Sequence, residues 1–172
     1  NMQKQLNLKV KFRESFRPFA PSIIDDELEN WFDTDGDSPY MLFVADVKDK
    51  HRKEIEISKE SSDVMDRLSV TRSTIPAVTH IDYSARIQTV HEETNPLYYA
   101  LLKEFFNSTG CPILVNTSFN VRGEPIVCSP EEAFRCFMGT ELDLLVIGDK
   151  ILYKQHQDPN LKENYENHFA LD

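Results

Sequence analysis

The spacing of apolar residues along the chain predicts three helices. Leucine and phenylalanine recur at helical spacing over residues 95–110, which begin with Asn-Pro and end with glycine, the residues preferred at the two ends of a helix. Ser129 and Glu132 have the spacing of a capping box, which predicts the start of a second helix. A shorter capped helix is expected within residues 22–32, because Ser22 precedes an acidic turn and apolar residues at helical spacing.

Short runs of β-branched and aromatic residues predict strands around these helices. The predicted strands occupy residues 40–47, 75–80, 85–90, 112–115, 142–148 and 151–153. We expect the first to be buried and the second and third to form a hairpin, while residues 59–70 suit either a surface helix or a flexible excursion. Strands and helices alternate without internal repeats, which favours an α/β or α+β layered domain.

The length and composition of the chain suit one globular domain. Its 172 residues, 40% of them hydrophobic, can bury about two-thirds of the surface of the unfolded chain, and no apolar run is long enough to span a membrane. Because it opens on Asn1-Met2 without a signal peptide, we expect a piece of a longer protein. Cys111, Cys128 and Cys136 form no C-x-x-C pair, which disfavours a disulfide framework or a thiolate zinc site and fits the reducing cytosol.

The net charge is −10, but basic residues gather near the N-terminus. Among the first seventeen residues, five cations face a single acid, Glu14; they are Lys4, Lys9, Lys11, Arg13 and Arg17. If residues 11–22 (KFRESFRPFAPS) are extended, Lys11, Arg13 and Arg17 share one face and the phenylalanines at 12 and 16 share the other. This pattern favours capture of a phosphate-like anion, although a solvated charge stripe also explains it. The net charge and the lack of an RNP-like motif disfavour nucleic acid.

A polar stretch, NTSFNVRGEP at residues 116–125, follows the strand predicted at 112–115. Asn116, Ser118 and Asn120 lie where that strand ends, and ligands of open α/β sheets bind beyond the carboxyl ends of strands. Hydroxyl and N–H groups there suit phosphate or carbonyl oxygens, and Arg122 can add a bidentate fork. On the pattern alone, a turn in which Asn and Ser bond their own backbone is the more conservative interpretation.

A third group of polar residues follows residue 78. Thr79, His80, Asp82 and Arg86 contain a possible acid–base pair and a further cation, but a lone histidine on a strand is more often a structural hydrogen-bonding group. The acidic run 33–38 lacks the glutamate that completes an EF-hand loop, so a solvated turn is preferred to a metal site. Neither a Walker loop nor a G-x-S-x-G elbow is present.

Five separated segments resemble, in the same order, the C-terminal region of NodU/CmcH-type O-carbamoyltransferases. The resemblance covers about residues 5–154 and rests on KFRESFRPFAPS, YMLFVADV, IPAVTHIDYSARIQTV, PILVNTSFNVRGEPIVCSPEEAFRCF and LDLLVIGDKIL. It implies a YrdC/Sua5-like α/β (α+β) domain over residues 1–155, with a twisted mixed sheet and packed helices, followed by a polar tail at 156–172. A Kae1-like N-terminal domain of the same polypeptide is expected to be absent from this chain.

The resemblance also implies an activity. Such a domain is expected to bind carbamoyl phosphate and ATP, with Mg²⁺, and to form carbamoyl adenylate with release of pyrophosphate. The Kae1-like domain would then carbamoylate an acceptor hydroxyl, and any metal of that domain would be missing with it. The alternatives are a non-catalytic YrdC-like module that binds nucleotide or RNA, and an interaction domain that shapes its partner's site.

By resemblance, the expected catalytic residues are Arg17, Arg86 and Ser118. Arg17 would neutralise phosphate oxygens, Arg86 would stabilise charge that develops during adenylyl transfer, and Ser118 would hold the carbamoyl or phosphate group. The expected substrate-binding residues are Lys11, Arg13, Thr79, His80, Asn116, Asn120 and Arg122. No metal ligand is expected within this chain.

Overall fold

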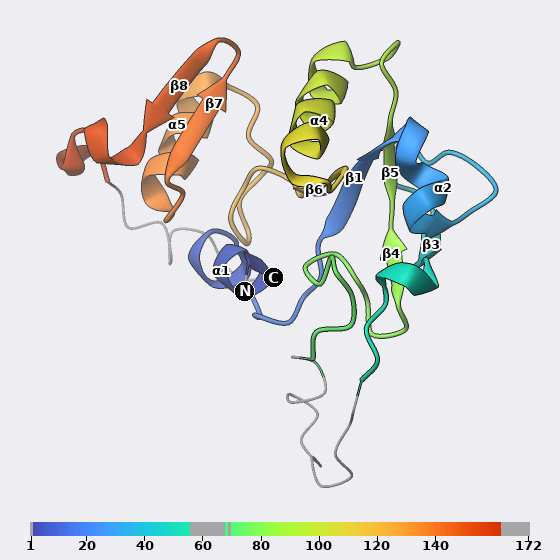
Figure 1. Ribbon diagram of the computed structural model, residues 1–172. Helices are drawn as coiled ribbons and strands as arrows, with labels where there is room; N and C mark the ends of the chain where they lie inside the picture. The colour runs from blue at the N-terminus through green and yellow to red at the C-terminus, as the bar shows by residue number, and fades with distance from the viewer. Residues whose placement is uncertain (1, 56–67, 69, 163–172) are drawn as a thin grey trace, which may run out of the picture. The chain divides into compact units, whose positions relative to one another are not determined.

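The computed structural model describes residues 2–55, 68 and 70–162, which pack as two compact units (Figure 1). The first unit combines the two ends of the chain, Asn1–Arg17 and Ser118–Asp172, and the second comprises Pro18–Thr117. The second unit is therefore an insertion in the sequence of the first.

The first unit is built from a helix covered by a β-hairpin. Its elements are α1 (Met2–Lys9), α5 (Pro130–Gly139), β7 (Leu144–Ile147), β8 (Lys150–Tyr153), η3 (Lys154–His156) and η4 (Pro159–Leu161). β7 and β8 pair antiparallel, and Leu145 packs with Ala133, Phe137 and Met138 of α5 in a small core. The two predicted closing strands are confirmed.

Both ends of α5 are capped by side chains. Ser129 Oγ accepts from the Glu132 N–H at 3.2 Å, and Glu132 Oε2 accepts from the Ser129 N–H at 3.2 Å, so the predicted capping box is confirmed. At the other end, Lys154 Nζ donates to the carbonyl oxygens of Phe137 and Thr140. A cation at this end also complements the helix dipole.

The second unit holds two small sheets. One has the order β5-β1-β6, with β1 (Ala20–Ile24) parallel to β5 (Gln88–Val90) and antiparallel to β6 (Ile113–Asn116). The other is antiparallel, with the order β2 (Phe32–Asp33), β3 (Val44–Val47) and β4 (Ser84–Arg86). Its short helices are η1 (Asp25–Glu27), α2 (Leu28–Trp31) and η2 (Asp49–His51). Helices and a mixed sheet confirm the α/β class and the strand predicted at 112–115.

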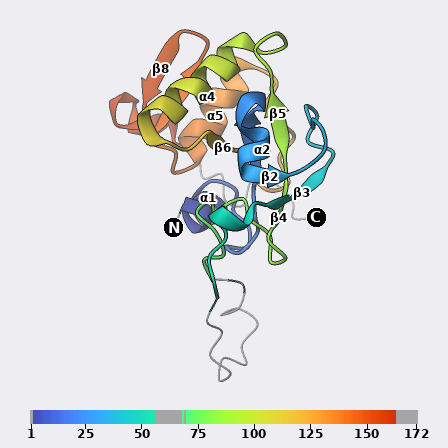
Figure 2. The ribbon, with the colours of Figure 1, turned by 45° about the vertical axis from the view of Figure 1, so that its right-hand side comes forward.

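Helix α4 (Pro96–Thr109) closes the core of the second unit. Leu102 is buried with Ile24 and Val90. Figure 1 shows α4 beside β6 and β1, and Figure 2 again shows it beside β6. Asn95 Oδ1 accepts from the Tyr98 N–H, while Gly110 ends the helix at φ 74°, in the left-handed region that glycine tolerates. The helix predicted over 95–110 is confirmed.

The strand predicted at 40–47 is wrong for its first half. Only Val44–Val47 pairs as a strand, and Tyr40 is 82% exposed. The backbone at 38–43 is held by other contacts, since the Thr89 N–H donates to the Ser38 carbonyl and the Phe43 N–H to Ser38 Oγ.

The predicted hairpin of 75–80 with 85–90 is also wrong. Residues 75–80 form turns, and the two strands that follow join different sheets, β4 beside β3 and β5 beside β1. Ser22 does not cap a helix either, because it lies inside β1 and donates to Gln88 Oε1 at 2.7 Å.

Of the possible helix at 59–70, residues 59–67 and 69 lie outside the described residues. Among the helices that the structure describes, none is long and apolar enough to cross a membrane.

Two adjacent leucines of α4 offer a matched test of the core. Leu102 is fully buried and Leu101 is 56% exposed. Leu102→Ala should lower the free energy of unfolding by about 3 kcal/mol through lost burial and a residual cavity, whereas Leu101→Ala should change it by less than about 0.5 kcal/mol. Urea denaturation of the two variants checks this, and equal losses would contradict the assigned packing of α4.

Candidate functional site

The buried ammonium of Lys11 organises the polar loop that follows β6. The side chain is only 5% exposed, and its Nζ donates to the carbonyl oxygens of Ser118 and Asn120, both at 2.8 Å. It also lies 2.7 Å from Asn120 Oδ1 and 3.2 Å from Ser118 Oγ. An ammonium has three protons, so these four oxygens use its whole donor capacity. Burial, with a smaller effect from the Arg13 charge, lowers the pKa of Lys11 to about 8.

The loop also bonds within itself. Ser118 Oγ donates to Asn120 Oδ1 at 2.6 Å, and Asn120 Nδ2 donates to the Glu124 carbonyl at 2.7 Å. Glu124 Oε2 in turn accepts from the Val121 N–H at 2.9 Å. These contacts agree with the conservative interpretation of the loop as a hydrogen-bonded turn. The sequence pattern did not indicate that the Lys11 side chain is buried against this turn.

Two predicted arginines face one carboxylate. Arg17 Nη1 lies 3.6 Å from Glu14 Oε2, and Arg122 Nη1 lies 3.5 Å from Glu14 Oε1. The pKa of Glu14 is lowered by its own backbone N–H and then by the charges of Arg122 and Arg17. Both distances exceed those of strong charge-assisted hydrogen bonds. The two arginines of this partly exposed cluster therefore bind the Glu14 carboxylate weakly.

Helix α1 fixes the segment that carries these cations. The buried Asn7 accepts from Arg13 Nε at 2.6 Å and donates to the Arg17 carbonyl at 2.8 Å. Gln3 Nε2, one helical turn earlier, donates to the carbonyls of Phe16 and Arg17. Sequence reasoning missed Asn7 and Gln3; their only signal is the four-residue spacing of two amides just before the basic segment.

The extended arrangement considered for residues 11–22 is found only at their end, where β1 begins at Ala20. Phe12 has φ 47°, residues 15 and 16 form a turn, and Lys11 points into the unit and not outward with Arg17. The burial of Lys11 against carbonyl oxygens, and the amides of α1, override the two-residue periodicity of a strand.

The second unit holds four of the predicted residues. Asn116 Nδ2 donates to Gln88 Oε1, the same oxygen that Ser22 Oγ reaches, so these polar groups bridge all three strands of the β5-β1-β6 sheet. Thr79 is buried and its hydroxyl donates to the Ile75 carbonyl at 3.0 Å. Arg86 lies on β4 with its side chain exposed.

His80 takes part in a turn that links three polar side chains. Its Nδ1 lies 2.8 Å from Ser84 Oγ, and Ser84 Oγ donates to Asp82 Oδ1 at 2.7 Å. The hydrogen bonds from the Ser84 side chain and backbone lower the pKa of Asp82. In a nucleophilic triad the acid bonds the histidine, not the serine, so this order supports a structural role and no activated nucleophile.

The structure therefore separates the predicted site into two groups. In the first unit, Lys11 contacts Ser118 and Asn120 directly, and Arg17 and Arg122 share Glu14. In the second unit the predicted residues are Thr79, His80, Arg86 and Asn116. Within the described ranges, no group of three or more His, Cys, Asp or Glu side chains is arranged to hold a metal ion.

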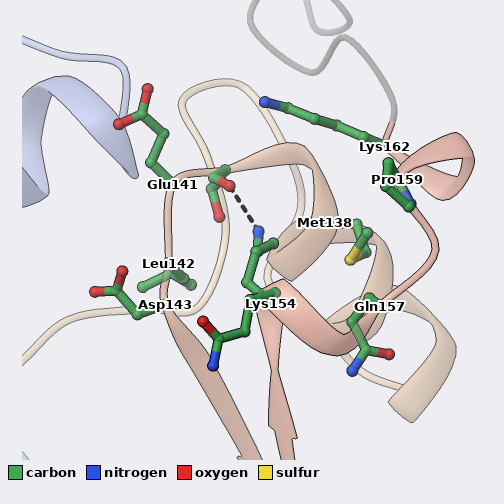
Figure 3. A pocket seen from close by; sticks show the side chains of 10 residues that line it. Met138, Glu141, Leu142, Asp143, Lys154, Gln157, Pro159 and Lys162 are labelled. Atoms are coloured by element: carbon green, nitrogen blue, oxygen red, sulfur yellow. Dashed lines mark hydrogen bonds between the residues drawn. The ribbon is translucent and has the colours of Figure 1, made fainter.

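The first unit also contains a cavity of about 420 Å³ that sequence reasoning missed. It lies between the C-terminal end of α5 and the segment after β8 (Figure 3), and Met138, Leu142 and Pro159 supply apolar walls. Lys154, labelled in Figure 3, donates from its ammonium group to the Thr140 carbonyl at 2.7 Å. None of the predicted site residues lines this cavity.

Comparison with known proteins identifies the family. The family described as "Carbamoyltransferase C-terminus" matches residues 1–154. The chain belongs to this carbamoyltransferase family. The predicted resemblance to NodU/CmcH-type carbamoyltransferases is thereby confirmed.

The relatives include an uncharacterized protein, a nodulation protein and a cephem O-carbamoyltransferase. The uncharacterized protein sll1178 of Synechocystis sp. is 52% identical over 96% of this chain. Nodulation protein NolNO of Sinorhizobium fredii is 36% identical over 90% of this chain, and 3'-hydroxymethylcephem-O-carbamoyltransferase of Streptomyces clavuligerus is 31% identical over 81%. The chain spans only 28%, 20% and 23% of these three proteins, respectively.

The Lys11 contacts predict a large effect of removing its charge. Lys11→Met leaves the carbonyls of Ser118 and Asn120 without their donor, which should lower the free energy of unfolding by about 2 kcal/mol. Lys4→Met, which removes an exposed lysine of the same unit, should change it by less than about 0.5 kcal/mol. Urea denaturation of both variants at neutral pH checks this, and similar values for the two would contradict the role of Lys11.

The same lysine predicts a pH dependence. The folded-state pKa of about 8 lies below the ordinary value of 10.5, so between these values the unfolded chain binds a proton that the folded chain lacks. The contribution of Lys11 to the free energy of unfolding should therefore rise with pH across this interval. The difference in stability between the native chain and Lys11→Met, measured at several pH values, isolates this slope from other groups. A flat difference would contradict the lowered pKa.

Proposed function

We propose that the chain is the C-terminal part of an O-carbamoyltransferase that binds carbamoyl phosphate and ATP and forms carbamoyl adenylate. A preceding Kae1-like region of the longer polypeptide then transfers the carbamoyl group to an acceptor hydroxyl. The observation that carries this proposal is the joining of Lys11, Ser118 and Asn120 in one unit with the Arg17–Glu14–Arg122 cluster. The named carbamoyltransferases among the relatives support the group transferred.

Atom balance defines the proposed reaction. Carbamoyl adenylate keeps one phosphorus atom, the α-phosphorus of ATP, so phosphate and pyrophosphate must both leave. Water first cleaves carbamoyl phosphate to carbamate and phosphate; a carbamate oxygen then bonds to the α-phosphorus as the bond to the β-phosphate oxygen breaks. Such a step depends on positioning and on stabilising charge, and it needs no protein nucleophile. ATP is expected to enter with Mg²⁺, the usual partner of its phosphates.

The roles proposed for the residues of the first unit depend on whether their hydrogen-bond donors can still bind an anion. Arg17 and Arg122 hold Glu14 only at 3.5–3.6 Å, so a phosphate can replace this carboxylate and gain two guanidinium partners. Lys11 contributes positive charge while it fixes the backbone of Ser118 and Asn120, and Arg13 adds a second cation nearby. Ser118 then holds the carbamoyl or phosphate group.

The residues of the second unit are assigned by family resemblance. Arg86 is proposed to stabilise charge during adenylyl transfer. Thr79, His80 and Asn116 are proposed to support substrate binding. We also propose that the protein works in the reducing cytosol, since Cys111, Cys128 and Cys136 are free thiols.

The arginine cluster gives the first test of binding. Arg17→Ala and Arg122→Ala should each weaken carbamoyl phosphate binding about tenfold, the effect of losing one charge-assisted hydrogen bond. Glu14→Gln should tighten it, because the competing carboxylate charge is gone. Isothermal titration measures all three, with Arg135→Ala, an exposed arginine of α5, as the matched control.

Three results would overturn this binding role. They are unchanged affinity in both arginine variants, weaker binding after Glu14→Gln, and an equal loss in the Arg135→Ala control. Salt-sensitive RNA binding without any response to carbamoyl phosphate would instead support the nucleotide- or RNA-binding module.

Arg86 gives a test of chemistry as distinct from binding. In the longer polypeptide, Arg86→Ala should reduce pyrophosphate–ATP exchange dependent on carbamoyl phosphate by about a hundredfold, as for removal of one transition-state donor. Its affinity for carbamoyl phosphate should stay within about twofold of the native protein, since that site is assigned to the first unit. Unchanged exchange would remove Arg86 from the reaction.

A further inference from the structure

The β7–β8 hairpin exposes an apolar face. The hairpin face is formed by Leu144, Val146, Ile151 and Tyr153, which are 44%, 59%, 58% and 47% exposed. The register places Leu144 opposite Tyr153 and Val146 opposite Ile151, so the four side chains are direct neighbours on one side of the hairpin.

The opposite side of the same hairpin is already buried. Leu145, Ile147 and Leu152 pack against α5 and its surroundings. An antiparallel sheet with one solvated side alternates apolar and polar residues, but here both sides are apolar. Apolar side chains that cluster on an exposed side of a small sheet mark a surface that contacts another polypeptide.

The charges around the hairpin face favour an apolar partner. The only charged residues of the hairpin lie at its tip, where Lys150 and Asp149 pair at 2.7 Å and cancel one another. A phosphate-rich ligand would find no net positive charge there. The partner must therefore bring apolar side chains of its own.

The length of the relatives points to the source of that partner. The chain spans 28% or less of the three relatives named above, and its family is the C-terminal part of a carbamoyltransferase, so most of each relative precedes the matching region.

Chain that precedes residue 1 enters the first unit through α1. The Lys9 carbonyl accepts from the Glu141 N–H at 3.0 Å, and Lys9 Nζ pairs with the Glu141 carboxylate at 2.8 Å. Glu141 lies three residues before Leu144.

Helix α1 therefore contacts the segment that leads into β7, the first strand of the hairpin, within the same unit. Figure 1 shows α1 near the end of the hairpin at which β7 begins. We propose that the hairpin face is the docking surface for the region that precedes this segment in the longer polypeptide. This inference goes beyond the proposed catalysis and rests only on family membership and on the first unit.

A photoreactive side chain tests the docking surface directly. In the longer polypeptide, benzoylphenylalanine in place of Tyr153 should cross-link within the same molecule to peptides of the preceding region, identified by mass spectrometry. The matched control is benzoylphenylalanine in place of Tyr40, an exposed tyrosine of the second unit. We expect the yield from position 153 to be at least about fivefold higher, because only that position lies on the proposed surface.

A charged substitution on the hairpin face provides the second arm. Val146→Asp should reduce the cross-link from position 153 at least about fivefold by placing a charge in an apolar contact. Leu42→Asp, a change at an exposed apolar residue of the second unit, should leave the yield unaltered. Because Val146 points away from α5, far-ultraviolet circular dichroism should show the fold intact.

Several outcomes would overturn the docking surface. They are cross-links between two copies of the chain, equal yields from positions 153 and 40, no cross-link from position 153, and an unchanged yield after Val146→Asp. None of these readouts requires substrate or turnover, so failure here is distinguishable from failure of the proposed carbamoyl-adenylate chemistry.

Discussion

The structure of the first unit depends on one buried ammonium group. Lys11 is separated by 107 residues from Ser118, and its bonds to the carbonyls of Ser118 and Asn120 join the two ends of the chain around the inserted second unit. A buried charge is tolerated only where its hydrogen-bonding groups are satisfied. The carbonyls of Ser118 and Asn120 must therefore face Lys11. This requirement fixes the backbone that leads to Arg122, whose side chain lies near Glu14.

The local charge near Glu14 differs from the net charge of the chain. The chain carries −10 overall, which would repel phosphates at long range, but Arg17 and Arg122 concentrate positive charge around one loosely held carboxylate. Over a few ångströms, two guanidinium groups outweigh a diffuse negative charge that salt screens. Under the proposed function, Glu14 would compete with an incoming phosphate for these two arginines.

The elements that sequence predicted correctly are those whose signals are local. The caps of α4 and α5 and the turn between β7 and β8 are each encoded within a few neighbouring residues, as is the strand before Asn116. Strand partners are not encoded in this way. Residues 85–90 were predicted as one strand paired with residues 75–80, but this stretch holds β4 and β5, which join different sheets. Basic residues at 11–17 were identified as important, but the burial of Lys11 depends on carbonyl groups more than a hundred residues away, which no local pattern reveals.

The insertion of one unit within the other also has a consequence for synthesis. The second unit is continuous, and its first and last strands pair directly, Ala20 with Asn116, so it can complete its fold as soon as residue 117 has emerged. The first unit cannot, because Lys11 must wait for residues 118–120 and Lys9 of α1 for Glu141. During that interval at the ribosome, Phe12 and Phe16 belong to an unfinished unit, and apolar side chains on an unfinished chain are the kind of segment that chaperones bind.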